Sequence, residues 1–175
     1  MKVTLESERL ILRPWSIDDA EDMFYGWANS PVATKYLTWN PHKSIEDTKL
    51  IISKWIDEYQ KPERLNFAII LKDSAKLIGG IDVVGYLDGM PVIGYCLSLD
   101  YWNNGYMTEA CKCVINYLFS LGYKEVRIDA DVDNISSNRV IQKCGGVFQF
   151  QEEHEYKSKN KKVIINSYLV KNKDL

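Results

Sequence analysis

The stretch Tyr101-Trp102-Asn103-Asn104-Gly105-Tyr106-Met107-Thr108-Glu109-Ala110 organises the rest of the chain, because a strand ends before it and a helix begins within it. The apolar run from Val92 to Leu97 precedes it, and apolar residues at helical spacing follow from Thr108 to Leu121. The first N–H groups of a helix have no partners within the helix and carry the positive end of its dipole. A turn that points these groups outward is an anion site, and phosphate is the usual anion.

Gly105 strengthens this prediction, because a residue without a Cβ lets a diphosphate approach the backbone closely. The alternative is an ordinary connection between strand and helix in which the glycine serves only the geometry of the turn. The stretch is not a P-loop, since no Gly-Lys-Ser/Thr follows, and it lacks the three-glycine spacing of a dinucleotide fingerprint. On these residues alone, both interpretations stay open.

Length and composition place limits on the class of protein. The chain has 175 residues, which is long enough to bury a full core, and we expect residues 1–175 to form one domain. With 46% hydrophobic and 26% charged residues it has the composition of a soluble globular protein, and its net charge of −2 argues against a nucleic-acid binder. No apolar run approaches the roughly 20 residues that span a bilayer, and the first residues lack the apolar segment of a signal peptide. We therefore expect a cytoplasmic protein that binds neither nucleic acid nor membrane.

The cysteines and histidines do not form a metal site in this interpretation. No pair among the four cysteines has Cys-X-X-Cys spacing; they are Cys96, Cys111, Cys113 and Cys144. Cys111 and Cys113 are two apart on a predicted helix and point to different faces, so we expect free thiols in a reducing compartment. The two histidines, His42 and His154, lack ligand spacing, so we expect no metal.

Hydrophobic patterning predicts an α+β fold. Apolar and β-branched runs predict seven strands, at residues 5–13, 65–71, 76–84, 92–98, 125–132, 147–153 and 162–170. Capping residues and helical spacing predict four helices, beginning after Ser16, after Ser44, at Thr108 and at Asn134, the second of which ends by Pro62. The order implies a mixed, mostly antiparallel sheet of about seven strands, flanked by about four helices, with a parallel pair between the Val92 and Glu125 strands. Ligands of such sheets bind at the carboxyl ends of these strands.

Three motifs, in this order on matching predicted elements, carry a family resemblance over nearly the whole chain. They are Glu8-Arg9-Leu10-Ile11-Leu12-Arg13-Pro14 followed by Asp18-Asp19-Ala20, Ile93-Gly94-Tyr95 followed by the turn quoted above, and Asn134-Ile135-Ser136-Ser137-Asn138-Arg139-Val140-Ile141-Gln142-Lys143-Cys144-Gly145. Together they resemble the GNAT superfamily of N-acetyltransferases, and within it the ribosomal-protein-alanine N-acetyltransferase (RimJ/RimL-like) branch. The resemblance implies the acyl-CoA N-acyltransferase fold, in which the parallel pair splays apart.

The resemblance further implies that acetyl-CoA is the co-substrate. In the family, backbone N–H groups of the turn hold the pyrophosphate, which here would be those of Asn103, Asn104, Gly105, Tyr106, Met107 and Thr108. The pantetheine arm lies between the splayed strands like an added half-strand and bonds to the backbone near Leu97. The Leu97 N–H would then polarise the acetyl carbonyl group.

Two residues of the last motif take family roles. Asn134 matches the asparagine beside the pantetheine, although it would also serve as a helix N-cap. Ser137 matches the serine near the CoA sulfur and is a candidate acid for the leaving thiolate; the alternative is a hydroxyl bonded to the first turn of its helix. A thiol with a pKa near 8.5 is a fair leaving group, so loss of this acid would cost little.

The chain departs from the family pattern at two positions that concern these roles. The glycine or alanine that usually closes the turn is Met107, a larger side chain. Many relatives place a tyrosine acid one helical turn after the serine position, and here that residue is Ile141. The tyrosine-acid mechanism at that position is therefore excluded.

The acceptor of the acetyl group must be a free amine. An α-amine, with a pKa of about 7.7–8.0, is partly neutral at physiological pH, whereas a lysine, near 10.4, is protonated. An N-terminal acceptor therefore needs only a weak base or a water chain, and the sequence offers Asp82, Asp129, Asp131 and Glu109 without choosing among them. Asp129 and Asp131 share one face of a strand, and Glu109 has the alternative of stabilising the helix dipole.

The loop before the second helix contains Trp39 and His42, where members of the family shape the acceptor pocket. Both are candidate substrate residues, and His42 has the alternative of a solvated loop histidine. We expect an N-acetyltransferase, monomeric or homodimeric, that acts on a protein N-terminal α-amine by direct attack. The alternatives are the same chemistry on a small amine or antibiotic, and, in a different class, a non-catalytic CoA-binding sensor or interaction module.

Overall fold

The computed structural model describes residues 3–61 and 63–173, so Pro62, expected to end the second helix, lies outside the described residues. Within these ranges eight strands form one sheet in the order β1-β2-β3-β4-β5-β6-β8-β7. The strands are β1 (Leu5–Glu6), β2 (Leu10–Arg13), β3 (Asn66–Leu71), β4 (Leu77–Leu87), β5 (Met90–Leu97), β6 (Glu125–Asp131), β7 (Val147–Tyr156) and β8 (Lys161–Lys171). Neighbouring strands are antiparallel except for β5 and β6, which confirms the mixed sheet predicted from the sequence.

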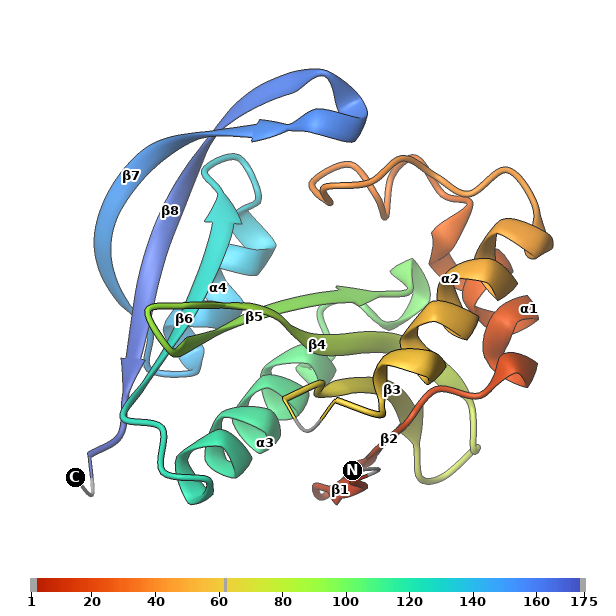
Figure 1. The fold of residues 1–175 in the computed structure, drawn as a ribbon, viewed down its shortest axis with the longest axis horizontal. Helices are drawn as coiled ribbons and strands as arrows, with labels where there is room; N and C mark the ends of the chain where they lie inside the picture. Colours follow the sequence, from red (N-terminus) through yellow and green to blue (C-terminus); the bar gives the residue numbers. More distant parts are fainter. Residues whose placement is uncertain (1–2, 62, 174–175) are drawn as a thin grey trace.

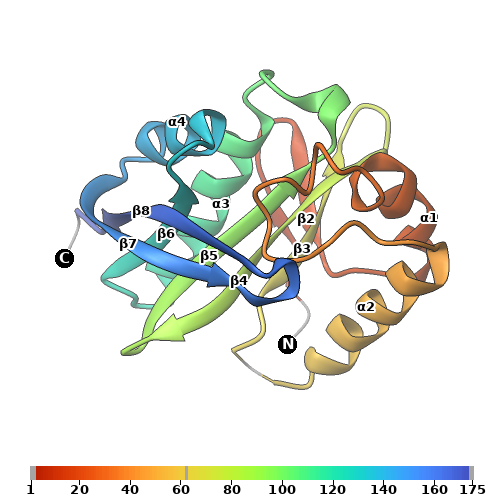
Figure 2. The same cartoon turned by 90° about the horizontal axis from the view of Figure 1, so that it is seen from above.

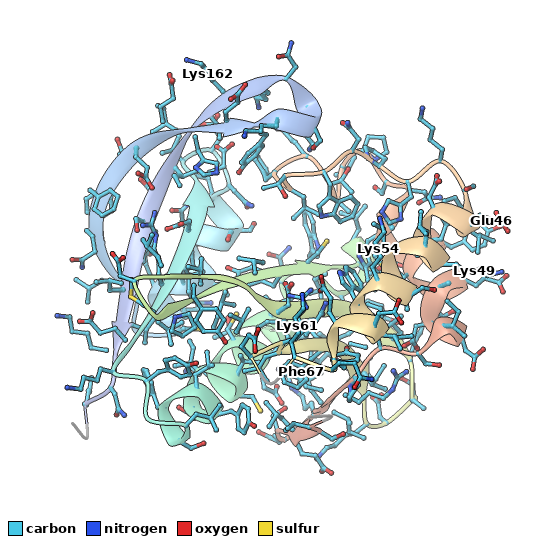
Figure 3. All side chains as sticks on the ribbon, in the orientation of Figure 1. Glu46, Lys49, Lys54, Lys61, Phe67 and Lys162 are labelled. Carbon is cyan, nitrogen blue, oxygen red and sulfur yellow. The ribbon has the colours of Figure 1, made fainter. Side chains whose placement is uncertain are left out.

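Four α-helices lie on the two faces of this sheet in the part of the chain that the structure describes. They are α1 (Ala20–Met23), α2 (Ile45–Glu58), α3 (Tyr106–Ser120) and α4 (Ile135–Lys143). Figures 1 and 2 show α1 and α2 on one side and α3 and α4 on the other. The apolar core is divided between the two faces of the sheet. Leu118 of α3 belongs to one cluster, and Trp27 and Ile52 belong to the other. Charged residues of the outer surfaces, such as Glu46 and Lys49 of α2, point away from the sheet (Figure 3).

The N-terminal strand predicted over residues 5–13 is two short strands. They form a hairpin in which Leu5 pairs with Leu12, and Ser7 N donates to Leu10 O at 3.0 Å across the turn. The Glu109 carboxylate accepts hydrogen bonds from Ser7 Oγ at 2.7 Å and Arg9 N at 2.8 Å, which fixes the turn against α3. Because these partners are about 100 residues away in the chain, local patterning did not show the break.

The first helical segment is less regular than the single helix predicted to begin after Ser16. The Ser16 cap is present, with a capping box to Asp19, but a 3₁₀ turn (Ile17–Asp19) precedes α1 and a wider π turn (Phe24–Ala28) follows it. Asn29 N donates to Phe24 O at 3.1 Å, five residues back. Gly26, a poor helix former, lies within the widened turn.

The caps of the two longer helices follow the sequence closely. Ser44, the predicted start of α2, forms a capping box with Asp47, and Asp47 N donates to Ser44 Oγ at 3.1 Å. Helix α3 begins at Tyr106, two residues earlier than predicted, because Gly105 is itself the N-cap with φ +80°. Gly122, with φ +93°, follows the end of α3 in the left-handed conformation that commonly terminates a helix.

Candidate active site

The parallel strands β5 and β6 separate after a short paired segment. Among the described residues they pair only at Val92 with Arg127 and Ile93 with Ile128, and beyond these positions they run apart (Figure 1). In the antiparallel ladder of β4 and β5, Ser98 N donates to Ile78 O at 2.8 Å. Hydrogen-bonded and non-hydrogen-bonded pairs alternate in such a ladder, so the N–H and C=O groups of Leu97 face away from β4, toward the gap.

The turn between β5 and α3 presents open backbone groups. Gly105 has φ +80° and Asn103 φ +61°, both in the left-handed region. No side chain of the described residues caps α3, so the N–H groups of its first turn are free to bind an anion. An added Cβ at Gly105 would lie 3.5 Å from Arg9 Nη2, so this face of the turn is bare backbone with a cation beside it.

Contacts of Arg9 and Glu109 stabilise this turn. Arg9 Nε lies 2.7 Å from Glu109 Oε2, and Arg9 Nη1 donates to Asn104 O at 3.1 Å. The Arg9 guanidinium group also lies over the Tyr106 ring, 4.4 Å from its centroid. Glu109, one of the candidate bases, is therefore held in a structural ion pair at the start of α3.

A cavity of about 250 Å³, here called the turn cavity, lies against this turn. Its lining includes all of the predicted phosphate-binding residues except Asn104, together with Leu97, Asn134 and Ser137. Met107 is 6% exposed and packs in the core, so its larger side chain does not fill the cavity. Arg139 and Lys143, one turn apart on α4, add positive charge to the lining. Neither was predicted from the sequence, although two cations four residues apart on the helix that follows Asn134 were a usable signal.

A larger cavity, of about 610 Å³, lies on the α1 and α2 side of the sheet. We call it the tryptophan cavity, because four of the tryptophans line it: Trp15, Trp27, Trp39 and Trp55. The Trp15 and Trp55 rings lie 5.1 Å apart. Three carboxylates, Asp82, Asp129 and Asp131, and one cation, Arg64, also line it.

The loop before α2 and the tip of the β7–β8 hairpin are joined on this side (Figures 1 and 2). Asn40 Nδ2 donates to Ser158 O and Lys159 Nζ donates to Thr34 O, each at 2.6 Å. The hairpin also contributes His154 and Tyr156 to the cavity, two residues that sequence reasoning did not assign to the site. The tryptophan cavity is thus built from segments more than 100 residues apart.

The two cavities meet where β5 and β6 diverge. Both are lined by Tyr95 and Cys96 of β5 and by Asn134 and Ser137 at the start of α4. The Tyr95 and Ser137 hydroxyl groups lie 2.8 Å apart, and Ser137 N donates to Asn134 Oδ1 at 3.2 Å, which confirms Asn134 as a helix cap. Burial raises the pKa of Tyr95 well above its ordinary value, so the phenol keeps its proton. Tyr95 is a site residue that the sequence showed only as part of a motif.

Cys96 lies at the same junction and would be the obvious nucleophile for a covalent route. Burial raises the pKa of its thiol to about 12. The thiolate is the reactive form of cysteine, and at neutral pH it is almost absent here. This favours direct attack of the acceptor over an acyl-cysteine intermediate.

The three carboxylates of the tryptophan cavity differ in how they are held. Asp129 accepts from Arg127 Nε at 2.8 and 2.9 Å, and Asp131 accepts from Asp133 N at 2.9 Å. Asp82 has only a long contact, 3.5 Å, with Arg64 Nη1, and burial raises its pKa to about 6. A carboxylate with this pKa is ionised at pH 7 and still basic enough to accept a proton.

His42 and Trp39, predicted together as substrate residues, have different positions. Trp39 lines the tryptophan cavity, whereas His42 is not among the residues that line either cavity. His42 Nδ1 lies 2.8 Å from Thr48 Oγ1, and its ring lies 5.0 Å from that of Trp39. Burial lowers the pKa of His42, so the imidazole is neutral at pH 7 and supports the Trp39 ring by packing.

Within residues 3–61 and 63–173, no group of three His, Cys, Asp or Glu side chains is arranged to hold a metal ion. All four cysteines are free thiols. The same residues contain no helix that is both apolar enough and long enough to cross a bilayer.

Comparison with known families agrees with the fold. Residues 9–147 match the family model described as the acetyltransferase (GNAT) domain, and the chain therefore belongs to the GNAT family of N-acetyltransferases. A Bacillus subtilis relative named as the uncharacterized N-acetyltransferase YoaA is 33% identical over 152 residues, which cover 85% of this chain and 83% of the relative.

Solved structures share the fold over almost the whole chain. The microcin C7 self-immunity acetyltransferase MccE, solved with acetyl-CoA and AMP, superposes with a TM-score of 0.83 at 21% identity, covering 95% of this chain and 94% of its own. A Salmonella typhimurium acetyltransferase that modifies the N-terminal serine of a 50S ribosomal subunit protein superposes with a TM-score of 0.82 at 16% identity, covering 97% and 99%. At these identities the likeness concerns the fold alone.

Proposed function

We propose that this protein transfers the acetyl group of acetyl-CoA to the α-amine of a protein N-terminus, as in the RimJ/RimL-like branch, with residues 1–175 acting as one domain. The observation that carries the proposal is that the turn cavity and the tryptophan cavity adjoin, since Tyr95, Cys96 and Ser137 line both of them. One co-substrate can then enter from each side. The Salmonella typhimurium neighbour, which acts on an N-terminal serine, supports this choice of acceptor by analogy.

The turn cavity fits the chemistry of acetyl-CoA. The free N–H groups that open α3 suit a diphosphate, and Arg139 and Lys143 add cations on the facing helix. The gap beside β5 leaves the Leu97 N–H available to an extended pantetheine arm, whereas Leu97 O already accepts from Trp102 Nε1 at 2.8 Å. Asn134 also lines the turn cavity. Acetyl-CoA supplies an acyl group that is activated as a thioester.

In the proposed mechanism the Leu97 N–H donates to the acetyl carbonyl oxygen and stabilises the negative charge that develops there. The amine forms the new N–C bond as the C–S bond breaks. Ser137 gives its proton to the departing sulfur, while the Tyr95 hydroxyl, 2.8 Å away, keeps Ser137 oriented and its proton supplied.

The proton lost by the amine goes to Asp82, through water where the distance requires it. Asp82 is the cavity carboxylate whose pKa, about 6, best suits a base at neutral pH. Asp129 and Asp131 contribute negative potential that attracts a protonated amine to the tryptophan cavity. An α-amine then needs little help to lose its proton, because its pKa is near 8.

The proposal is tested by thiol release from acetyl-CoA across a panel of acceptors. The panel holds peptides with a free N-terminus, the same peptides acetylated at the N-terminus but with a free lysine, and small amines. We expect release with the first set and little with the second. Release with small amines alone would assign a small-molecule acceptor, and tight acetyl-CoA binding without release on the whole panel would identify a non-catalytic CoA-binding module.

A further inference from the structure

Asn66 of β3 is a buried polar residue in the lining of the tryptophan cavity, with 3% of its surface exposed. Its Oδ1 accepts a hydrogen bond from Trp15 Nε1 at 2.8 Å. An indole nitrogen only donates, so the Asn66 oxygen must face Trp15, and Nδ2 must be on the other side of the amide. Its backbone oxygen accepts from the Tyr59 hydroxyl at 2.7 Å, which fixes the residue further.

The Nδ2 group is a donor without a protein partner. Among the residues that the structure describes, none accepts a hydrogen bond from Asn66 Nδ2. Buried donors in native proteins are almost always paired, and an unpaired one in the wall of a binding cavity indicates a partner on the ligand. The partner required here is a hydrogen-bond-accepting atom of the acceptor substrate.

The charge around Asn66 decides the kind of atom. Asp82 is directly opposite on β4 and lines the same cavity, and it is ionised above pH 6. The nearby Arg64 is already shared between Asp82, at 3.5 Å, and Glu58, at 2.9 Å. A carboxylate placed at Asn66 would therefore meet a second negative charge, whereas a neutral carbonyl oxygen would not. The Trp15 and Trp55 rings provide apolar wall for the rest of the acceptor.

We propose that Asn66 Nδ2 binds a neutral amide carbonyl oxygen of the acceptor, so that this enzyme selects amines that carry a peptide-type amide over simple amines. The inference rests on the proposed function and narrows it, because it makes Asn66 a specificity-determining residue. Asn66 contacts substrate away from the reacting atoms, and its contribution depends on the presence of that carbonyl group.

The test compares two acceptors, phenylalanyl-alanine amide and phenethylamine, which share an aromatic ring and a primary amine but differ in the amide groups. Wild-type enzyme should prefer the dipeptide amide by at least about tenfold in kcat/KM calculated for the neutral amine, because the α-amine has the lower pKa and is more often neutral. Asn66→Asp keeps the oxygen that faces Trp15 and replaces the donor with an acceptor. At pH 8 it should lower kcat/KM for the dipeptide amide at least about tenfold more than that for phenethylamine, whose own change reports the effect of the new charge on Asp82.

Asn29→Asp is the matched control, since it adds the same charge at an exposed position outside both cavities, and it should change neither acceptor. Unchanged Tm and acetyl-CoA affinity would show that Asn66→Asp is folded; if it does not fold, the wild-type preference decides. An equal loss on both acceptors, no loss on the dipeptide amide, or a wild type that takes phenethylamine equally well would overturn the inference while leaving N-acetyltransferase activity intact. Absence of transfer to either acceptor would overturn the proposed function as well.

Discussion

The turn cavity and the tryptophan cavity adjoin each other but are built in different ways. The first is made largely of backbone, from a contiguous turn that opens α3, with Gly105 at φ +80°. The second is made of side chains from β3, β4, β6 and the hairpin, joined by contacts such as Lys159 to Thr34. A backbone site depends on local conformation, which a short motif specifies. A side-chain site depends on which distant elements the fold brings together.

This difference predicts that Gly105 has the largest effect of any single position on donor binding. Gly105→Val forces a β-branched residue to φ +80° and places a side chain over the amides, so acetyl-CoA affinity should fall about a hundredfold. Isothermal titration calorimetry measures the change. Gly122→Val is the matched control, because Gly122 has φ +93° at the other end of α3 with open space around it. Gly122→Val should lower Tm without weakening acetyl-CoA binding. Equal losses of affinity in both variants would contradict the proposal that the turn binds the phosphates.

Substitutions in the tryptophan cavity should lower turnover and leave acetyl-CoA affinity unchanged, which is the reverse of the Gly105 effect. Asp82→Asn should reduce kcat about 10- to 50-fold and leave acetyl-CoA affinity unchanged, because a neutral α-amine still attacks without a base. In wild type, kcat should rise with pH to a plateau with an apparent pKa of about 6, and the variant should lose this step. Asp73→Asn, an exposed position in the β3–β4 turn, is the control. A wild-type step at pH 6 that persists in Asp82→Asn would assign the base elsewhere.

The junction between the cavities should show a smaller effect. Ser137→Ala should lower kcat about fivefold, since a thiolate leaves readily without an acid. Tyr95→Phe should have a similar effect, and the double variant should be little worse than either single variant, because the two hydroxyl groups act through one contact of 2.8 Å. Steady-state kinetics on all three variants measures the coupling. Additive losses would mean that Tyr95 and Ser137 act separately.

The last expected effect concerns stability and leaves turnover aside. The pKa of Asp82 is raised from 3.8 in the unfolded chain to about 6 in the folded protein, so the folded state binds more protons between these values. Stability from this group is therefore present at low pH and is lost as pH rises from about 4 to 6, by on the order of 3 kcal/mol. Urea unfolding of wild type and Asp82→Asn at several pH values gives the difference curve. A difference that does not change across this window would contradict the burial of Asp82.

The parts of the structure that local residues determine were predictable from the sequence. The capping box of Ser44, the Gly105 turn and the parallel pair at Val92 follow from short patterns. The break in the first strand was not predictable, because it is held by Glu109 about 100 residues later. In the site, Asn134 and Ser137 belong to a motif, whereas the contact of Tyr95 with Ser137 depends on how β5 packs against α4. Asn66 carries no local signal, because its significance comes from Trp15 and from Asp82 on the next strand.

In the proposed mechanism, donor and acceptor enter from opposite faces of the sheet and meet beside Leu97. A crystal structure with a bisubstrate analogue, in which the CoA sulfur is joined through an acetyl spacer to a peptide α-amine, is the decisive experiment. We predict that the diphosphate contacts the amides of residues 105–108, the acetyl oxygen accepts from Leu97 N, and the peptide lies in the tryptophan cavity. An analogue whose diphosphate lies elsewhere, or whose peptide leaves the tryptophan cavity empty, would contradict the claim.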